Sequence, residues 1–363
     1  MDKQRVKFPE VLFFQEGPGV RNTQYTNEGV KLLNVANLVD GSIDLSTSDR
    51  YISTNEAFGK YKHFLCDEGD FIVASSGIKV EYIDKKMGFV TKEMLPLCMN
   101  TSTIRFKPLD KNILNIRYFM YFLKSNDFKQ QLSRHITGSA QLNYGPSHLK
   151  IMTMPLVSIE KQVAIVNKLD KTVKLLQIRN KQLQKFDNLI KARFVEMFGD
   201  PIRNSKNLPT DKISERYFLK AGITTSADEI HDYSEVYKTP CFGGNGVRGY
   251  VKSSTYSGEY PIIGRQGALC GNIQFATGNF HATEHAVLVT ILQNDNVLWV
   301  YYLLKFMDLN RFHTGAAQPG LSVKTLNTVD IITVDRKQQD EFASFAKQVD
   351  KSKVVNIFCV HRI

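Results

Sequence analysis

The sequence has few of the features that mark secreted, membrane-spanning or redox-active proteins. Its cysteines are few, odd in number and far apart, with no Cys-x-x-Cys pair, so we expect free thiols in a reducing cytoplasm. The longest apolar run, Ala286 to Leu292, is about seven residues, whereas a membrane-spanning helix needs roughly 20. The first residues carry mixed charge and only a short apolar patch, so we expect no export signal.

Motifs of enzymes that act on nucleotides or nucleic acids are missing as well. No two prolines are adjacent, which excludes the Asn/Asp-Pro-Pro-aromatic motif of amino-methyltransferases. No segment matches the P-loop Gly-x4-Gly-Lys-Ser/Thr, so no phosphate-binding loop is expected. The sequence therefore predicts no catalytic residue, no cofactor and no metal ligand of its own.

Positive charge is what the chain has in excess. The formal net charge is +11, and a balance this basic indicates a polyanionic partner. Nucleic acid is favoured over an anionic membrane surface because no long apolar segment accompanies the charge. The length of 363 residues and the apolar content of 42% predict two or so globular domains.

A heptad repeat runs through the middle of the chain, from Ser158 to Gly199. Two interleaved apolar series predict a coiled-coil helix, and the exposed positions are too rich in Lys and Arg for the alternative, a buried core helix. Asn180 and Asp187 interrupt one series, where a polar residue can fix the register of a helix pair. The residues expected to contact a partner helix are Val166, Leu169, Val173, Leu176, Leu183, Ile190, Phe194 and Met197.

The segments before and after this helix repeat the same order of elements. The matching blocks are Gly69–Gly77 with Gly258–Gly267, Tyr118–Lys124 with Trp299–Lys305, Gly138–Gln141 with Gly315–Gln318, and Val157–Gln162 with Val334–Gln339. Four blocks in one order predict a duplicated unit, a domain followed by a helix. Pseudo-two-fold symmetry would then pair the two helices in an antiparallel arrangement.

With these features the chain resembles one family, the DNA-specificity subunits of type I restriction-modification systems. The resemblance rests on the paired Gly-x-Ala-Gln loops at Gly138 and Gly315, on the strand-to-helix junctions before Gln162 and Gln339, and on the long leucine-rich helix. Three segments of the second half also look like target-recognition domains of that family: Phe242–Gly246, Ile262–Gly267 and Ala282–Ala286.

The resemblance implies an α/β (α+β) fold with two duplicated target-recognition domains, each of which reads one half of a split double-stranded DNA site. Coiled-coil helices would set the spacing and bind the methyltransferase and restriction subunits, and the chain itself would be a non-catalytic protein of the prokaryotic cytoplasm. The expected parts are a first recognition domain, a spacer helix, a second recognition domain, and a shortened second helix with an atypical tail: 1–157, 158–200, 201–338 and 339–363.

The end of the chain departs from the family pattern. The residues after Lys353 are β-branched and lack heptads, where the family would continue with amphipathic helix. We therefore expect the second helix, from Gln339, to be only about four turns long in a shortened product. Leu183 to Met197 would then be left exposed, and a second copy of the chain could cover them.

Polar side chains on turns are the expected DNA contacts, because Lys and Arg bind phosphates while Arg, Lys, Asn and Gln match base edges. Each candidate also has an alternative interpretation as an ordinary surface or turn residue. The candidates are Lys60, Lys62, Ser75, Ser76 and Lys79 in the first domain and Asn245, Arg248, Lys252, Arg265 and Gln266 in the second.

Two patterns suggest catalysis and keep other functions open. His281 to His285 spell the His-x-x-Glu-His motif of zinc peptidases, and Asp70 with Asp84-Lys85-Lys86 has the spacing of a metal-dependent nuclease core. The zinc site would need both histidines on one helical face, whereas the next residues are typical of a strand. The alternatives to an adaptor are a self-contained nuclease or hydrolase, and a scaffolding or RNA-binding repeat protein.

Overall fold

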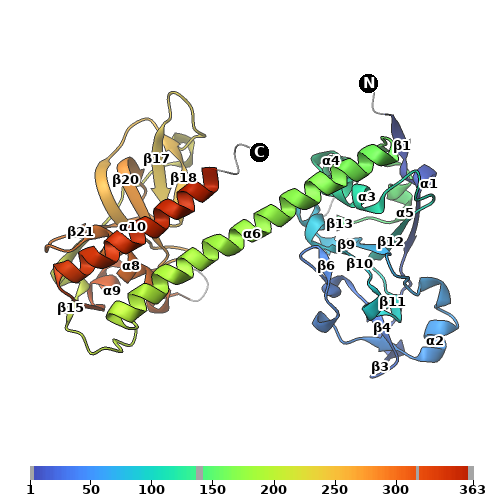
Figure 1. Cartoon of the computed structure of the whole chain (residues 1–363), viewed down its shortest axis with the longest axis horizontal. Helices are drawn as coiled ribbons and strands as arrows, with labels where there is room; N and C mark the ends of the chain where they lie inside the picture. The colour runs from blue at the N-terminus through green and yellow to red at the C-terminus, as the bar shows by residue number, and fades with distance from the viewer. Residues whose placement is uncertain (1–3, 136–141, 316–318, 359–363) are drawn as a thin grey trace. The chain divides into compact units, whose positions relative to one another are not determined.

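The computed structural model describes residues 4–135, 142–315 and 319–358, and it divides into two compact units. Unit 1 is Met1–Leu176 and unit 2 is Gln177–Ile363, so the boundary falls inside one long helix, α6 (Ile159–Phe198). This helix matches the one predicted from the heptad repeat (Figure 1). Of the repeated Gly-x-Ala-Gln loops, only Gly315 belongs to the described residues.

Unit 1 is built from short strands around two four-stranded sheets. One is antiparallel with the order β10-β8-β12-β2; the other has the order β11-β4-β7-β3, with β11 and β4 parallel. Its elements are β1 (Arg5–Lys7), α1 (Phe8–Val11), β2 (Leu12–Glu16), β3 (Tyr25–Thr26), β4 (Val30–Leu33), β5 (Leu38–Val39), β6 (Ser42–Ile43), β7 (Tyr51–Ile52), α2 (Thr54–Phe58), β8 (Phe71–Ala74), β9 (Ser76–Ile78), β10 (Met87–Phe89), β11 (Leu97–Met99), β12 (Thr103–Pro108), α3 (Ile116–Leu123), α4 (Asn126–His135), β13 (Leu142–Asn143), α5 (Pro146–Leu149) and β14 (Thr153–Pro155).

Phenylalanines of α1 and α3 form the centre of the unit 1 core. Phe119 is fully buried, and its ring packs edge-on against Phe8 at 5.1 Å between centroids. Apolar and aromatic residues recur at helical spacing from Ile116 to Leu132, a pattern that predicts one helix with its aromatic residues in the core. The phenylalanines are buried as predicted, but the helix is interrupted: Ser125 lies between α3 and α4, and its hydroxyl accepts a hydrogen bond from the N–H of Phe128, which caps α4.

Unit 2 contains one six-stranded sheet with the order β16-β21-β19-β20-β17-β18. The apolar run predicted as a strand is β21, whose first four residues are buried. The elements of unit 2 after α6 are β15 (Thr210–Lys212), α7 (Ile213–Arg216), β16 (Tyr217–Ala221), β17 (Thr239–Gly243), β18 (Gly246–Val251), β19 (Tyr256–Gly264), β20 (Ile273–Ala282), β21 (Ala286–Ile291), α8 (Val297–Phe306), α9 (Val323–Asn327), β22 (Asp330–Ile332) and α10 (Arg336–Phe358).

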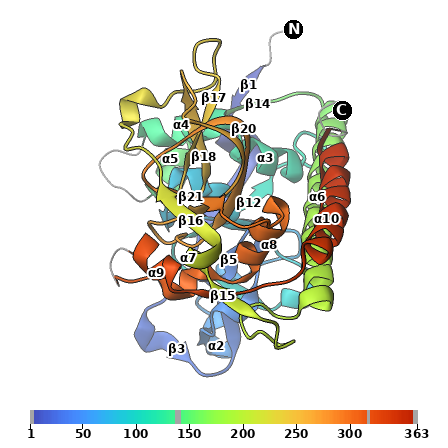
Figure 2. The ribbon, with the colours of Figure 1, turned by 90° about the vertical axis from the view of Figure 1, so that its left-hand side faces the viewer.

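Within unit 2, α10 pairs with the C-terminal part of α6 in an antiparallel arrangement, and Figures 1 and 2 both show the two helices side by side. The guanidinium of Arg193 lies 2.7 Å from the carboxylate of Glu341. The ammonium of Lys353 lies 2.8 Å from the carboxylate of Asp187. The earlier residue of α6, Asp187, thus contacts the later residue of α10, Lys353, and the two helices run in opposite directions. The predicted antiparallel pair is confirmed.

Two expectations about the helix pair are wrong, one about the length of α10 and one about the exposure of α6. Helix α10 was expected to have about four turns from Gln339, but it begins at Arg336, continues past Lys353 to Phe358 and spans 23 residues. β-Branched residues cost only a few tenths of a kcal/mol each in a helix, so the composition after Lys353 does not end it. The expected exposure of the segment Leu183–Met197 is also not observed, because Ile190 and Phe194 are fully buried in the unit 2 core.

A buried glutamine ties unit 1 to the first turn of α6. The Nε2 of Gln162 donates to the carbonyl oxygens of Ile113 and Val157, each at 2.8 Å. Its Oε1 accepts from the backbone N–H of Asn115 at 2.9 Å. Asn115 in turn caps α3, so one side chain joins the start of α3 to the start of α6.

Gln339 makes the equivalent connection in unit 2. Its Nε2 donates to the carboxylate of Asp295 at 2.7 Å and to the carbonyl oxygen of Val334 at 3.0 Å. Its Oε1 accepts from the backbone N–H of Asn296, the residue that caps α8, at 2.7 Å. The recurrence of Gln162 as Gln339, noted in the sequence, therefore corresponds to a repeated hydrogen-bond arrangement, as expected of a duplicated unit.

Candidate nucleic-acid interface

Three glycine-containing turns of unit 2 meet at the ends of β17 and β19 and at the start of β20, and we call residues 243–246, 264–267 and 271–274 together the glycine corner. The first turn joins β17 to β18 as a tight hairpin in which Gly243 pairs with Gly246. Gly246 has φ +103°, a conformation that glycine adopts without a steric penalty. Asn245 is thereby held exposed at the tip of the hairpin.

The second turn lies directly against the first. A Cβ at Gly264 would lie 1.9 Å from the carbonyl oxygen of Gly244, so no larger residue fits there. The next residue, Arg265, is fixed on both sides: its N–H donates to the carbonyl of His285 at 3.1 Å, and its own carbonyl accepts from the N–H of Leu321 at 2.8 Å. The corner therefore presents its side chains from a fixed backbone.

The polar side chains at the corner suit contact with bases. Arg265 is half-buried, and its Nε is fully buried without a hydrogen-bond partner among the described residues. The guanidinium makes no hydrogen bond or ion pair to a described residue, so this half-buried side chain has donors available for acceptors on a ligand. Gln266, the next residue of the corner, is exposed, and so is Arg248 on the adjoining strand β18. Arginine matches the O6 and N7 of guanine, and amides match adenine.

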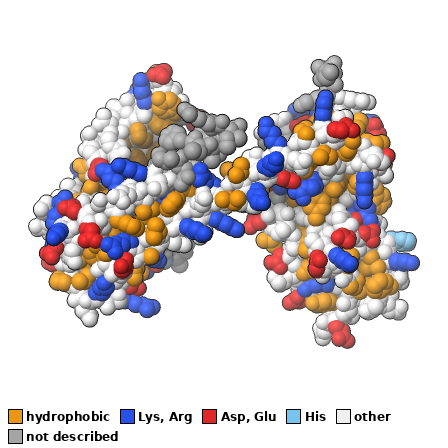
Figure 3. Space-filling view, viewed as in Figure 1, with side chains coloured by type: hydrophobic (Ala, Val, Ile, Leu, Met, Phe, Trp, Pro, Cys, Tyr) orange, Lys and Arg blue, Asp and Glu red, His pale blue; other side chains and the backbone are white. Residues whose placement is uncertain are grey.

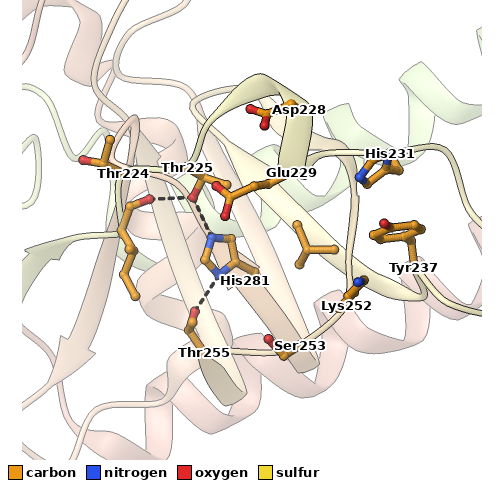
Figure 4. Close-up of a pocket in the computed structure, with 12 residues that line it drawn as sticks. Thr224, Thr225, Asp228, Glu229, His231, Tyr237, Lys252, Ser253, Thr255 and His281 are labelled. Carbon is orange, nitrogen blue, oxygen red and sulfur yellow. Dashed lines mark hydrogen bonds between the residues drawn. The ribbon is translucent and has the colours of Figure 1, made fainter.

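Lys252 directly follows β18, at the end of the strand away from the glycine corner, and lines a pocket of about 440 Å³ (Figure 4). Its ammonium lies 5.6 Å from the centre of the Tyr237 ring. The structure thus brings Asn245, Arg265 and Gln266 together and places Arg248 on the adjoining strand, but it separates Lys252 from them.

His281 lies in the wall of this pocket and is only 8% exposed. Its Nε2 is 2.8 Å from the hydroxyl of Thr225 and its Nδ1 is 3.1 Å from the hydroxyl of Thr255. Because the Thr225 hydroxyl donates to the carbonyl of Ile223, it accepts from Nε2–H, and Nδ1 accepts from Thr255. Burial lowers the pKa of His281, which favours this neutral form.

The His-x-x-Glu-His sequence does not form the helical arrangement that a zinc peptidase needs. His281 belongs to strand β20, whereas His285 lies in the turn before β21, with its Nε2 3.1 Å from the carboxylate of Glu284. Both ring nitrogens of His281 are already hydrogen-bonded to threonines. Within residues 4–135, 142–315 and 319–358, no group of three or more His, Cys, Asp or Glu side chains could hold a metal ion.

The candidates of unit 1 lie in two separate places. Ser75 directly follows the buried strand β8 and is only 1% exposed; its hydroxyl donates to the carboxylate of Glu16 at 3.3 Å. Ser76 is half-buried at the start of β9, and Lys79 is exposed just after that strand. Lys60 and Lys62 are exposed beyond α2, on either side of a tyrosine that belongs to a small separate core.

The acidic pattern that suggested a nuclease has structural partners instead. Asp70 is 2% exposed, and its carboxylate lies 3.1 Å from the guanidinium of Arg105 and 3.0 Å from the ammonium of Lys107. Asp84 faces a different residue, Lys129, at 3.4 Å. The two carboxylates therefore have different cationic partners, each of which is consistent with a structural role.

The predicted helix-pairing residues have three different environments. Val166 belongs to the core of unit 1, and Ile190 and Phe194 belong to the core of unit 2. Leu183 and Met197 are half-buried. Leu169, Val173 and Leu176 are 36%, 42% and 48% exposed, and Figure 3 shows apolar and basic side chains together along this part of α6.

Sequence reasoning missed Asn272, whose side-chain N–H donates to the Oδ1 of Asn245. A single asparagine after a glycine is typical of any turn, so no local signal could have identified it. Within the described parts of the chain, no helix is long and apolar enough to cross a bilayer.

Comparison with known proteins gives a consistent result. The family model for the type I restriction modification DNA specificity domain matches residues 20–187 and 213–356. The specificity subunit of the type I restriction enzyme EcoprrI from Escherichia coli is 43% identical over 133 residues, 36% of this chain and 33% of that protein. The MjaVIII specificity subunit from Methanocaldococcus jannaschii is 25% identical over 194 residues, 51% of this chain and 43% of that protein. The matched stretches thus span less than half the length of these curated relatives.

Two solved structures share the fold. The S subunit of a type I restriction-modification system from M. genitalium aligns with a TM-score of 0.60 at 16% identity, over 99% of this chain and 92% of that one. A chain from a study of complex assembly and conformational transition of the type I R-M system aligns with a TM-score of 0.50 at 14% identity, over 97% and 91%.

Proposed function

Since this chain belongs to the family of type I restriction-modification DNA specificity domains, we propose that it is the DNA-reading subunit of such a system. Each unit contacts one part of a split double-stranded DNA site, while separate methyltransferase and restriction subunits carry out the chemistry. The observation that carries the proposal is the glycine corner, a fixed backbone that presents the unpaired guanidinium of Arg265 beside the exposed Asn245 and Gln266.

The contacts divide into two kinds. At the corner, Arg265, Asn245 and Gln266 reach base edges, and Arg248 reaches either a base or a phosphate. The exposed lysines and Ser76, at the start of β9, contact phosphates, and the net charge of +11 makes binding dependent on salt through counterion release. These phosphate contacts are Lys60, Lys62, Ser76, Lys79 and Lys252; the buried Ser75, whose hydroxyl donates to Glu16, supports them from below.

The helices provide spacing and docking in this proposal. Residues 1–157 and 201–338 are the recognition domains, 158–200 the spacer helix and 339–363 the second helix with the tail. Leu169, Val173 and Leu176 are exposed apolar residues of α6, a surface that a methyltransferase subunit or a second copy of the chain would cover. A chain that works in this way needs no catalytic residue of its own.

The alternative, a self-contained nuclease or hydrolase, has less support. The carboxylate of Asp70 is paired with two cations, and both nitrogens of His281 are hydrogen-bonded to threonines. A catalytic metal would have to displace these partners.

The test is to co-express the chain with its methyltransferase subunit and to map methylated adenines in the host genome. The proposal predicts a two-part motif with a fixed gap. Arg265→Ala should relax one base pair of one part, with a loss of roughly 1–3 kcal/mol against the preferred base. Lys252→Ala, the matched removal of a cation away from the corner, should weaken binding to all sequences alike and lower the salt slope by roughly one. A contiguous motif, or equal effects of the two variants, would contradict the proposal.

A further inference from the structure

Asn272 is attached to the glycine corner by both its backbone and its side chain. It follows Gly271, which has φ +83°, and its carbonyl accepts from the N–H of Gly264 at 2.9 Å. Its side-chain Nδ2 donates to the Oδ1 of Asn245, at the tip of the neighbouring hairpin. Asn272 therefore joins the two turns whose backbones are already in contact.

In the structure this hydrogen bond directs the Oδ1 of Asn245 toward Asn272. A primary amide has an acceptor oxygen and a donor nitrogen of nearly equal size, and a free one can turn either toward a ligand. Here the oxygen is held by Asn272, so the two N–H donors of Asn245 are left for a partner. Asn245 is exposed and Asn272 is half-buried, so Asn245 is the residue that can touch a ligand and Asn272 the one that orients it.

We infer that Asn272 is a positioning residue that determines the base preference at one position of the DNA site, an inference that rests on the function proposed above. With its donors outward, Asn245 selects a base edge that offers acceptors in the major groove, such as guanine O6 and N7 or thymine O4. It disfavours cytosine, whose N4 amino group is a donor. The identity of one base pair thus depends on a residue that does not touch it.

Asn272→Asp tests this inference because it replaces the hydrogen-bond donor that faces Asn245 with an acceptor. A carboxylate only accepts hydrogen bonds, so Asn245 must turn its amino group toward residue 272 and present its oxygen outward. The preference at that position should then change from acceptor-bearing to donor-bearing bases, cytosine or adenine. A good base contact discriminates by roughly 1–3 kcal/mol, so the ratio of preferred to disfavoured base should change by roughly 5-fold to 100-fold. Asn272→Ala, which leaves the amide free to turn, should abolish the preference without reversing it.

The assay is selection from a library of randomised duplex DNA by the full chain bound to its methyltransferase subunit. Asn279→Asp is the matched control, because Asn279 is an exposed asparagine of β20 and receives the same change of charge. It should select the same motif as the wild type. Emission from Trp299, which is buried in the unit 2 core, checks that each variant is folded.

The outcomes separate the inference from the proposed function. A reversal confined to one base pair in Asn272→Asp, with an unchanged motif in Asn279→Asp, supports the inference. An unchanged motif in Asn272→Asp, or a uniform loss of affinity at every position, overturns the inference and leaves the proposed function standing. A wild-type complex that selects no sequence overturns the proposed function and the inference with it.

Discussion

Ile190 and Leu189 are adjacent isomeric residues of α6, and replacing each with alanine removes the same three carbons. Their surroundings differ sharply, because Ile190 is fully buried in the unit 2 core whereas Leu189 is 48% exposed. We expect Ile190→Ala to destabilise unit 2 several times more than Leu189→Ala. The pair therefore tests whether α6 is packed as the structure shows.

The expected magnitudes follow from burial. Three buried carbons at about 0.8 kcal/mol each amount to about 2.4 kcal/mol of transfer free energy for Ile190. The cavity left behind adds to this, so a free-energy loss of about 3–4 kcal/mol is expected, within the range measured for such truncations. Leu189 has about half as much buried area to lose, and solvent fills the space, so its loss should be about 1 kcal/mol.

Urea denaturation followed by tryptophan fluorescence measures this difference. Trp299 is the only tryptophan in the sequence, it is 1% exposed, and it lies in the same core as Ile190, so its emission reports the unfolding of unit 2. With a slope of about 2 kcal/mol per molar urea, Ile190→Ala should lower the midpoint by about 1.5–2 M and Leu189→Ala by about 0.5 M. Equal shifts, or a larger shift for Leu189→Ala, would refute the packing described here.

Two further perturbations use the same fluorescence signal. Gln339→Leu should lower the midpoint by roughly 0.5–1.5 M, because the N–H of Asn296 and the carboxylate of Asp295 lose a buried partner at about 1–3 kcal/mol; Gln162→Leu, its counterpart in unit 1, should leave this transition unchanged. Burial alone raises the pKa of Asp295, but hydrogen bonds from Arg216 and Gln339 outweigh it, and the net pKa lies below 3.8. Since the folded pKa is below the unfolded one, this stabilisation is complete well above pH 3.8 and is lost as the pH falls through the folded pKa. Asp295→Asn should therefore flatten the decline of the midpoint during acidification from pH 5, and a steeper decline would contradict the assignment.

Much of the fold was predictable because its signals are local. The heptads predict a helix from Ser158 to Gly199, where Gly199 and the following Pro201 favour its end, and the structure has Ile159–Phe198. The end of α10 was not predictable in this way. The residues near Phe358 have no heptad pattern, yet their helix-forming cost is small, and the preceding turns are held in place by packing against α6.

The candidate site was only partly predictable, because it depends on contacts between distant segments. The glycines around Asn245 indicated a tight turn, and Arg265 was recognised as a polar residue after a strand. The two turns touch because both flank the turn between β20 and β21: Phe242 of β17 pairs with Ala282, and Gly264 of β19 pairs with Ala286. Ser75 shows the limit of residue type: serine suits a surface turn, but Ser75 is buried directly after a buried strand, and its hydroxyl donates to the carboxylate of Glu16.

Pairing separates the functional candidates of this chain from the structural ones better than residue type does. Arg105 and Arg265 both have a buried Nε without a partner among the residues described, but the other guanidinium nitrogens of Arg105 are bonded to the carboxylate of Asp70 and to carbonyl oxygens such as that of Leu65. The guanidinium of Arg265 makes no such bond to a described residue. With 47 Lys and Arg in the sequence, charge alone cannot select a contact residue. The side chain of Arg265 is therefore held by a backbone bonded on both sides, while its guanidinium makes no ion pair or hydrogen bond to a described residue. A guanine edge with two acceptors matches the two-donor face of such a guanidinium.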